Sequence, residues 1–186
     1  LSRPLVGMIS RMVDQKGLDL IEQLSADLPH LGASFVVLGT GEPRYQDMWR
    51  SLATRHPQTI GARIGFGEGL AHLIDGGADM FLMPSRYEPC GLSQMIAMRY
   101  GCVPIVSAVG GLRDTVTKET GFVFNKPVVQ SFSAAIRAAL RVFPDGEHWA
   151  QLQRAGMAKD FSWVNSAKQY FTLYQSLVHE TTPTAS

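Results

Sequence analysis

The sequence predicts an α/β fold, a doubly wound parallel sheet with helices on both faces, and three observations support this prediction. Short apolar runs of strand type alternate along the chain with amphipathic segments at helical spacing. The connections between them are short, which is typical of parallel sheets whose strands are joined by crossover helices. Polar, glycine-rich loops follow the predicted strands, and in a parallel sheet such loops share one rim, where ligands bind. These loops are residues 10–17, 39–41, 65–69, 84–93 and 107–111.

The first half of the pattern begins with an apolar run at residues 5–9, typical of a strand buried on both faces of a parallel sheet. Leucine and isoleucine at helical spacing then predict a helix at 18–28. The second strand, 34–38, ends at a Gly-Thr-Gly turn, and apolar positions at 45–53 predict the next amphipathic helix. Residues 59–66 form a weaker strand pattern.

The middle of the chain continues the alternation. A short helix at 70–74 precedes a strand at 79–83, which is continuously apolar after its first residue, Asp79. The following helix, 92–99, stops just before Gly101, because glycine is a common helix terminator. Residues 103–106 predict a further strand, whose proline lies near its start, where a missing N–H donor is tolerated.

The last third is mainly helical. The pair Gly110-Gly111 predicts a polar turn, and residues 121–124 predict a last short strand. From residue 129 the apolar positions follow helical spacing, and they end in a helix at 163–179 that carries several aromatic side chains.

The length of 186 residues suffices for one well-buried domain, which we expect to span residues 1–180, with a disordered tail at 181–186. The chain does not begin with methionine, and a strand pattern starts almost at once. These two features predict that the chain is a segment of something longer.

Composition and charge exclude several classes of function. With 17 basic and 16 acidic residues the net charge is only +1, so nothing predicts binding to nucleic acid or to an anionic membrane. No apolar run approaches the roughly 20 residues that span a bilayer, and the start lacks a signal-peptide pattern. Two cysteines are too few for a disulfide framework. We therefore expect a cytoplasmic protein.

Familiar catalytic and cofactor motifs are absent from the sequence. No G-x-G-x-x-G follows a strand, because Arg44 interrupts the pattern after Gly39 and Gly41. The sequence has no Walker lysine, no H-E-x-x-H and no G-x-S-x-G, and its five histidines are scattered singly. We expect neither a metal site nor a cofactor.

Anion binding remains a possible function of the loops at this rim of the sheet. Arg11 and Lys16 lie in one loop between a strand end and a helix start, so both cations can converge on a phosphate group. Two solvated loop charges are the simpler alternative. Gly91 permits close approach of a ligand, while the N–H groups of Leu92 and Ser93 and the Ser93 hydroxyl lie at a helix start. The rim could thus hold a diphosphate.

Two further residues on the rim have two interpretations each. Glu88 follows a strand and precedes a helix, so its carboxylate could carry out chemistry or could simply belong to a helix start. Phe66 could provide a stacking surface for a base, or it could pack in the core.

The chain carries five motifs in order: Ser10-Arg11-x-x-x-Gln15-Lys16-Gly17, Leu38-Gly39-Thr40-Gly41, Pro84-Ser85-Arg86-Tyr87-Glu88-Pro89-Cys90-Gly91-Leu92, Ala97-Met98-Arg99-Tyr100-Gly101 and Gly110-Gly111-Leu112-x-Asp114-Thr115. Together they resemble the C-terminal half of bacterial glycogen synthase and plant starch synthase, within the GT-B glycosyltransferases. The resemblance extends into the final helix and covers nearly the whole chain. It implies the Rossmann-like, nucleotide-sugar-binding domain of a GT-B enzyme.

The resemblance also implies an activity, which is the retaining transfer of glucose from ADP-glucose to the non-reducing end of an α-1,4-glucan in the bacterial cytoplasm. By this resemblance Arg11 and Lys16 would bind the donor diphosphate and stabilise the departing ADP, with no metal required. Glu88 would contact the donor glucose and stabilise its cationic transition state. Phe66 would lie beside adenine, and the phosphate cradle would be completed by Gly91, Leu92 and Ser93.

The family pattern limits what this chain can do alone. In these enzymes the N-terminal domain supplies a Lys-x-Gly-Gly-Leu loop and most contacts to the glucan acceptor. By the resemblance this domain is missing here, so we expect the isolated chain to be inactive. The resemblance also implies that the final helix lies partly against that domain, so we expect the helix to present an apolar patch in this chain. Ile96 stands where many related transferases carry a second glutamate, which argues against the sucrose and lipid-sugar transferases. Two alternatives stay open, namely a GT-B transferase that uses a UDP-sugar and a nucleotide-binding module without transfer activity.

Overall fold

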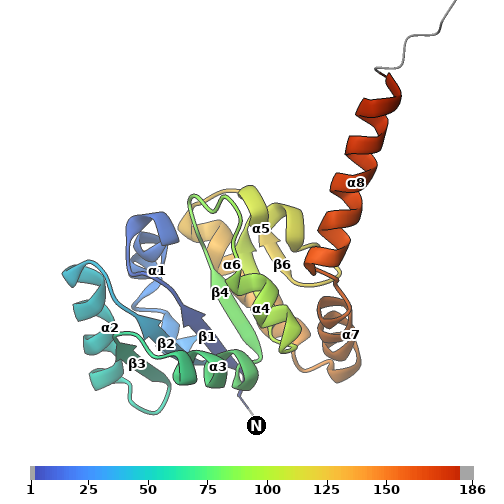
Figure 1. Ribbon diagram of the computed structural model, residues 1–186. Coiled ribbons are helices and arrows are strands. Elements are labelled where there is room, and N and C mark those ends of the chain that lie inside the picture. Colours follow the sequence, from blue (N-terminus) through green and yellow to red (C-terminus); the bar gives the residue numbers. More distant parts are fainter. Residues whose placement is uncertain (1–2, 181–186) are drawn as a thin grey trace, which may run out of the picture.

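Six parallel strands form a single sheet in the order β3-β2-β1-β4-β5-β6 (Figure 1). The structure, a computed structural model, describes residues 3–180; the tail predicted at 181–186 lies outside the described residues. The strands are β1 (Leu5–Ile9), β2 (Ser34–Gly39), β3 (Ile60–Ile64), β4 (Met80–Met83), β5 (Val103–Ser107) and β6 (Phe122–Phe124). All six predicted strands are therefore confirmed, and their bounds differ from the prediction by at most two residues.

A helix follows each strand. The helices are α1 (Leu18–Leu24), α2 (Pro43–Arg55), α3 (Glu68–Gly77), α4 (Ser93–Arg99), α5 (Gly110–Thr115), α6 (Val129–Val142), α7 (Gly146–Met157) and α8 (Trp163–Glu180). Of these, α1 to α5 are crossover connections between strands, and α6 to α8 come after the last strand. Single 3-10 turns lie at η1 (Asp14–Lys16) and η2 (Leu28–His30). The helix predicted at 18–28 is shorter than expected, since α1 ends at Leu24 and residues 28–30 form a separate 3-10 turn that contains Pro29.

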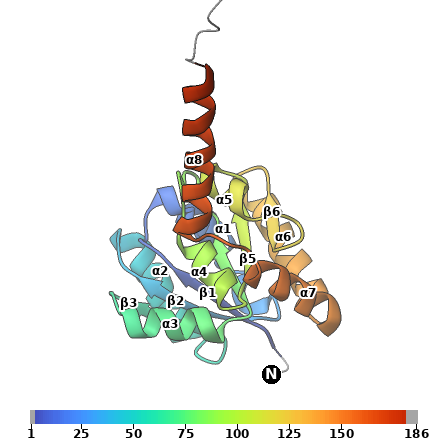
Figure 2. The ribbon, with the colours of Figure 1, turned by 45° about the vertical axis from the view of Figure 1, so that its right-hand side comes forward.

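The core has two layers, one on each face of the sheet. The side chains of β4 alternate between them, because Met80 and Leu82 join the cluster under α1, α2 and α6, whereas Phe81 and Met83 join the cluster under α4 and α5. The helices accordingly cover both faces (Figures 1 and 2). This arrangement confirms the predicted doubly wound α/β fold.

The direction of winding changes between two central strands. β1 pairs with β2 on one side, with Leu5 opposite Ser34, and with β4 on the other side, with Val6 opposite Met80. Because the loops after β1 and β4 lead to helices on opposite faces, a crevice forms at the carboxyl ends of these two strands. This is the switch point at which such sheets bind ligands.

The final helix, α8, extends away from the sheet and its covering helices (Figures 1 and 2). Its apolar side chains are largely in solvent, and they include Trp163, Val164, Tyr170, Phe171, Leu173 and Tyr174. The predicted apolar patch on this helix is therefore present.

Candidate functional site

The loop after β1, residues 10–17, and the loop after β4, residues 84–92, pack directly on one another at the switch point. Gly17 has a φ of 74°, and a Cβ atom built there would lie 2.0 Å from the carbonyl oxygen of Pro84. Only glycine satisfies both the left-handed backbone and this close approach. The two loops therefore hold their charged side chains at a short, defined separation.

Lys16 and Glu88 meet across these two loops. Lys16 Nζ donates a hydrogen bond to Glu88 Oε2 at 2.5 Å, and Ser85 Oγ donates to the same carboxylate oxygen at 3.1 Å. The two charged side chains are only 17% and 9% exposed. A charge that is this far removed from water is stable only when it is paired and hydrogen-bonded, and both conditions hold here. Glu88 does not belong to a helix start, because α4 begins at Ser93, five residues later, and its role in chemistry stays a prediction.

The backbone around Glu88 is supported from the other side by the start of α5. Gly111 N–H donates to the Glu88 carbonyl at 3.0 Å, and a Cβ atom at Gly110 would lie 2.1 Å from that same carbonyl oxygen. A Cβ atom at Gly111 would lie 1.8 Å from the Cys90 carbonyl oxygen. The prediction of a polar turn at this glycine pair was wrong, because the pair begins a helix and the glycines permit its close packing on the Glu88 loop.

A polar hollow of about 220 Å³ lies at the ends of β1 and β4. Its walls include three of the residues predicted to bind phosphate, Arg11, Lys16 and Ser93. Ser93 is the first residue of α4, whose N-terminal N–H groups carry partial positive charge. The structure therefore brings two cations and a helix start to one cavity, as the sequence predicted, and its size suits one or two phosphate groups.

A second hollow, of about 410 Å³, adjoins the first and shares Ile9, Ser10 and Arg11 with it. Its lining is mostly apolar and includes Leu38 and Phe66. Phe66 is 86% exposed, so the alternative that it packs in the core is wrong. An exposed aromatic ring beside a shallow apolar hollow is a suitable surface for stacking a planar ring.

Gly91 and Leu92 do not line the polar hollow. Gly91 is buried with a φ of 70°, and the space above its Cα is filled by Gln94. Gln94, which the sequence prediction missed, is fully buried and its Nε2 donates to the Gly91 carbonyl at 2.8 Å and to Thr115 Oγ1 at 3.0 Å. Leu92 is exposed and faces a different cavity. Gly91 and Leu92 thus shape the loop, and a direct contact with phosphate stays a prediction.

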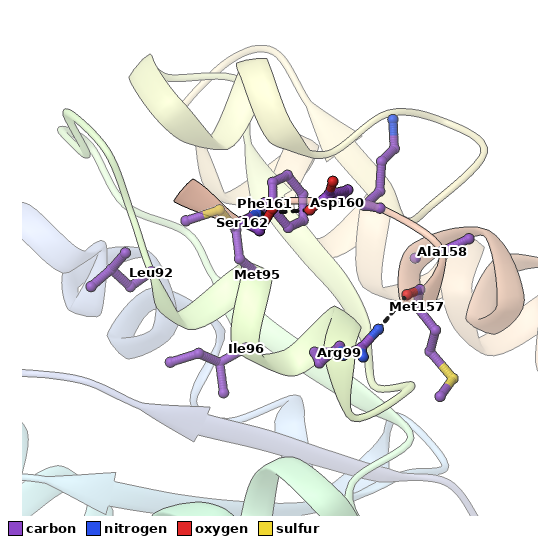
Figure 3. A pocket seen from close by; sticks show the side chains of 11 residues that line it. Leu92, Met95, Ile96, Arg99, Met157, Ala158, Asp160, Phe161 and Ser162 are labelled. Atoms are coloured by element: carbon purple, nitrogen blue, oxygen red, sulfur yellow. Dashed lines mark hydrogen bonds between the residues drawn. The ribbon is translucent and has the colours of Figure 1, made fainter. Parts of the chain in front are cut away.

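A larger hollow, about 630 Å³, lies between α4 and the connection from α7 to α8 (Figure 3). Leu92, Met95 and Ile96 form one wall, and Phe161 lies on the other. Two of its polar side chains have partners within the wall, since Arg99 donates to the Met157 carbonyl at 3.1 Å and Asp160 accepts from the Ser162 N–H. Lys159 also lines this hollow, but the rest of the lining is mostly apolar, and Arg11, Lys16 and Ser93 lie in the smaller hollow instead. We therefore take the smaller pair of hollows as the candidate site.

Within residues 3–180, no three His, Cys, Asp or Glu side chains gather as they would around a metal ion. The expectation that no metal takes part stays a prediction. No helix in this described part of the chain has both the length and the apolar character needed to cross a bilayer.

A parallel sheet with helices on both faces and a site at its switch point defines a Rossmann-like α/β domain. Residues 1–154 match the family described as "Glycosyl transferases group 1", and the chain belongs to this family. The match covers β1 to β6 and most of the helical part, so both hollows of the candidate site lie within it.

Relatives and a solved structure agree with this assignment. The chain is 49% identical over 183 residues to the glycogen synthase of Anaeromyxobacter sp. (strain K), covering 94% of this chain and 38% of that protein. It is 46% identical over 179 residues to the glycogen synthase of Koribacter versatilis (strain Ellin345), covering 92% and 37%. The catalytic domain of Arabidopsis thaliana starch synthase IV, solved with ADP and acarbose, superposes with a TM-score of 0.82 at 37% identity, covering 95% of this chain and 38% of that one. The chain spans less than two fifths of the length of these proteins.

Proposed function

We propose that this chain is the donor-binding half of a glycogen or starch synthase. In this proposal the complete enzyme transfers glucose, with retention of configuration, from ADP-glucose to the non-reducing end of an α-1,4-glucan. Two curated relatives that match nearly the whole chain are glycogen synthases, and a plant starch synthase of similar fold was solved with ADP and acarbose. These similarities support both the nucleotide and the glucan in the proposal.

The observation that carries the proposal is the meeting of Arg11, Lys16 and the first residue of α4, Ser93, around one polar hollow. Two cations and a helix N-terminus together favour a dianionic ligand such as a diphosphate. The adjoining apolar hollow with the exposed ring of Phe66 would take the adenine base. A nucleoside diphosphate spans both hollows in this arrangement, because the two share Arg11.

The proposed chemistry places each charge where the reaction needs it. When the bond between glucose and the diphosphate breaks, its electron pair leaves with ADP, and negative charge grows on the phosphate. Arg11 and Lys16 would stabilise that charge without a metal ion, because they already lie beside the hollow. The carboxylate of Glu88 would stabilise the positive charge that develops on the sugar. Lys16 has three N–H donors, so it can hold Glu88 and still contact phosphate.

The test joins this chain to the N-terminal domain of a relative, such as the Anaeromyxobacter glycogen synthase, in place of the matching 183 residues. Incorporation of labelled glucose into glycogen is then compared between the unchanged joined protein and its Glu88→Ala variant. We expect transfer from ADP-glucose and its loss in the variant. Arg50→Ala is the matched control, since Arg50 lies on the exposed face of α2.

The outcomes separate the proposal from its alternatives. Unchanged transfer by Glu88→Ala would reject the role of Glu88. A joined protein that unfolds cooperatively and binds ADP without any transfer would favour a nucleotide-binding module. Preference for UDP-glucose in a direct donor competition would replace the proposed donor. The chain alone should not elongate glucan, so glucose incorporation by the pure chain would overturn the requirement for a second domain.

A further inference from the structure

Arg86 lies in the loop that carries Glu88, but its side chain extends toward α1 and the loop after β6. Its Nε donates to Asp19 Oδ1 at 3.0 Å, its Nη2 donates to Asp19 Oδ2, and its Nη1 donates to the Pro127 carbonyl at 3.4 Å. Its backbone N–H donates to the Gln15 carbonyl at 2.9 Å. In return, Gln15 Nε2 donates to the Tyr87 carbonyl at 3.2 Å. A single residue thus ties three rim loops together.

The pairing of Arg86 with Asp19 is stronger than an ordinary surface contact. The two side chains are 39% and 22% exposed, and the planar guanidinium meets both carboxylate oxygens at once. Such two-point pairs fix orientation as well as distance. By contrast, Arg50 and Asp47 on α2 are 56% and 71% exposed and meet at one oxygen. The hydrogen bond to Asp19 raises the pKa of the Arg86 guanidinium above its already high ordinary value.

The position of this pair along the chain gives it an effect on the site. Asp19 lies three residues after Lys16, and Arg86 lies two residues before Glu88. The Arg86–Asp19 contact and the Gln15 contacts therefore flank Lys16 on both sides along the chain, and on the other loop they come directly before Glu88. A shift of one loop against the other would strain or break these contacts. They are thus placed to hold Lys16 and Glu88 at their observed separation.

We propose that Arg86, through Asp19, is a positioning residue that sets where Lys16 stands relative to a diphosphate in the polar hollow. This inference rests on the proposed function, because it assumes that the hollow binds the diphosphate of a nucleotide. Arg86 does not line either hollow and touches no ligand in the proposal. Its effect should fall on the part of the nucleotide that Lys16 contacts, which is the diphosphate rather than the base.

The experiment measures binding of ADP and of AMP to the whole 186-residue chain by titration calorimetry. AMP keeps the base and one phosphate, so the ratio of the two affinities reports on the second phosphate. The test variants are Arg86→Lys and Asp19→Asn. Arg86→Lys keeps the positive charge but loses the planar guanidinium that contacts both carboxylate oxygens. Asp19→Asn keeps the shape of the side chain but removes its negative charge. Arg50→Lys is the matched control on the exposed pair of α2. Thermal unfolding of each variant identifies any general loss of structure.

We expect both test variants to reduce the ratio of ADP to AMP affinity by about tenfold, the equivalent of one charge-assisted hydrogen bond. The double variant should be no worse than either single one, because the two side chains act as a unit. An equal loss of ADP and AMP affinity would show a merely structural role, and an unchanged ratio would reject the proposal. If the unchanged chain binds neither nucleotide, the proposed function fails instead, so the two failures are distinguishable.

Discussion

Lys16 Nζ lies 2.5 Å from Glu88 Oε2, although 72 positions separate the two residues in the chain. Both side chains are largely buried, and the only other side chain recorded on that oxygen in the described part of the protein is Ser85. Removing one member of such a pair leaves an uncompensated charge in a poorly hydrated place. The pair is therefore a sensitive point for stability as well as for the proposed chemistry.

We predict that Lys16→Met lowers the free energy of unfolding by about 3 kcal/mol, because Glu88 is left buried without its cation. The double variant Lys16→Met/Glu88→Gln should recover part of this loss, since it removes the stranded charge. Urea unfolding at pH 7 measures both effects. As a control, Arg50→Met breaks the exposed Arg50–Asp47 pair and should cost no more than about 1 kcal/mol. Equal losses of unfolding free energy in Lys16→Met and Arg50→Met would contradict the prediction.

Much of the fold could be predicted because its signals are local. The strand β4 is a short apolar run, and the helix α6 has apolar side chains at helical spacing, so each is visible in a window of a few residues. The short helix α5 could not be predicted in this way. In the local sequence pattern, Gly110 and Gly111 indicate a turn. In the structure, their missing side chains allow α5 to pack against the backbone of Glu88 and Cys90.

The sequence could predict which residues meet at the candidate site, but not which side chains contact one another there. Strand ends of a parallel sheet share a rim, so the meeting of Arg11, Lys16 and Ser93 follows from the topology. Which of these charges pairs with which side chain depends on loop packing between distant segments. No local pattern signals that Arg86 reaches Asp19, or that a buried Gln94 covers the glycine of its loop.

We predict that Gly17→Ala is much more destabilising than Gly32→Ala, although both glycines have positive φ, 74° and 84°. A methyl group at Gly17 would meet the Pro84 carbonyl at 2.0 Å, whereas nothing lies within 4 Å of the same position at Gly32. The backbone strain, about 1–2 kcal/mol, is common to both. The contact at Gly17 should add about 1–3 kcal/mol, because the two rim loops must separate.

Urea unfolding of the two variants measures this difference. Calorimetry with ADP adds a second criterion, since separation of the loops at Gly17 should also weaken nucleotide binding, while Gly32→Ala should leave it unchanged. Similar unfolding free energies for the two variants would show that the close approach of Gly17 to Pro84 contributes nothing.

We predict that Phe66→Ala weakens ADP binding by about tenfold without lowering stability, because stacking on a base contributes about 1–3 kcal/mol. The ring is 86% exposed, so its removal leaves no cavity in the core. Leu73→Ala is the matched control, since Leu73 is also highly exposed on the nearby helix α3 but lies outside both hollows. Thermal unfolding and ADP calorimetry check both parts, and a Phe66→Ala chain that binds ADP normally would remove the ring from the proposed site.

Asp75, on α3 and away from the candidate site, should make stability depend on pH. Its carboxyl group is buried, and within residues 3–180 its Oδ1 has no hydrogen-bond partner. Burial raises the pKa of Asp75, while the charge of nearby His72 acts in the opposite direction. A carboxyl group with a raised pKa in the folded state favours folding while it is protonated. That contribution is present below the unfolded pKa, about 3.9, and is lost as the pH rises through the folded pKa.

We therefore predict that Asp75→Asn, which cannot ionise, gains stability relative to the unchanged protein as the pH rises from about 4 toward 8. Thermal unfolding at several pH values measures the difference in Tm, which should be smallest at the acidic end and largest near neutrality. Asp47→Asn serves as the control, because Asp47 is exposed on α2 and its substitution buries nothing. A difference between Asp75→Asn and the unchanged protein that stays constant across this range would show that burial does not impede the ionisation of Asp75.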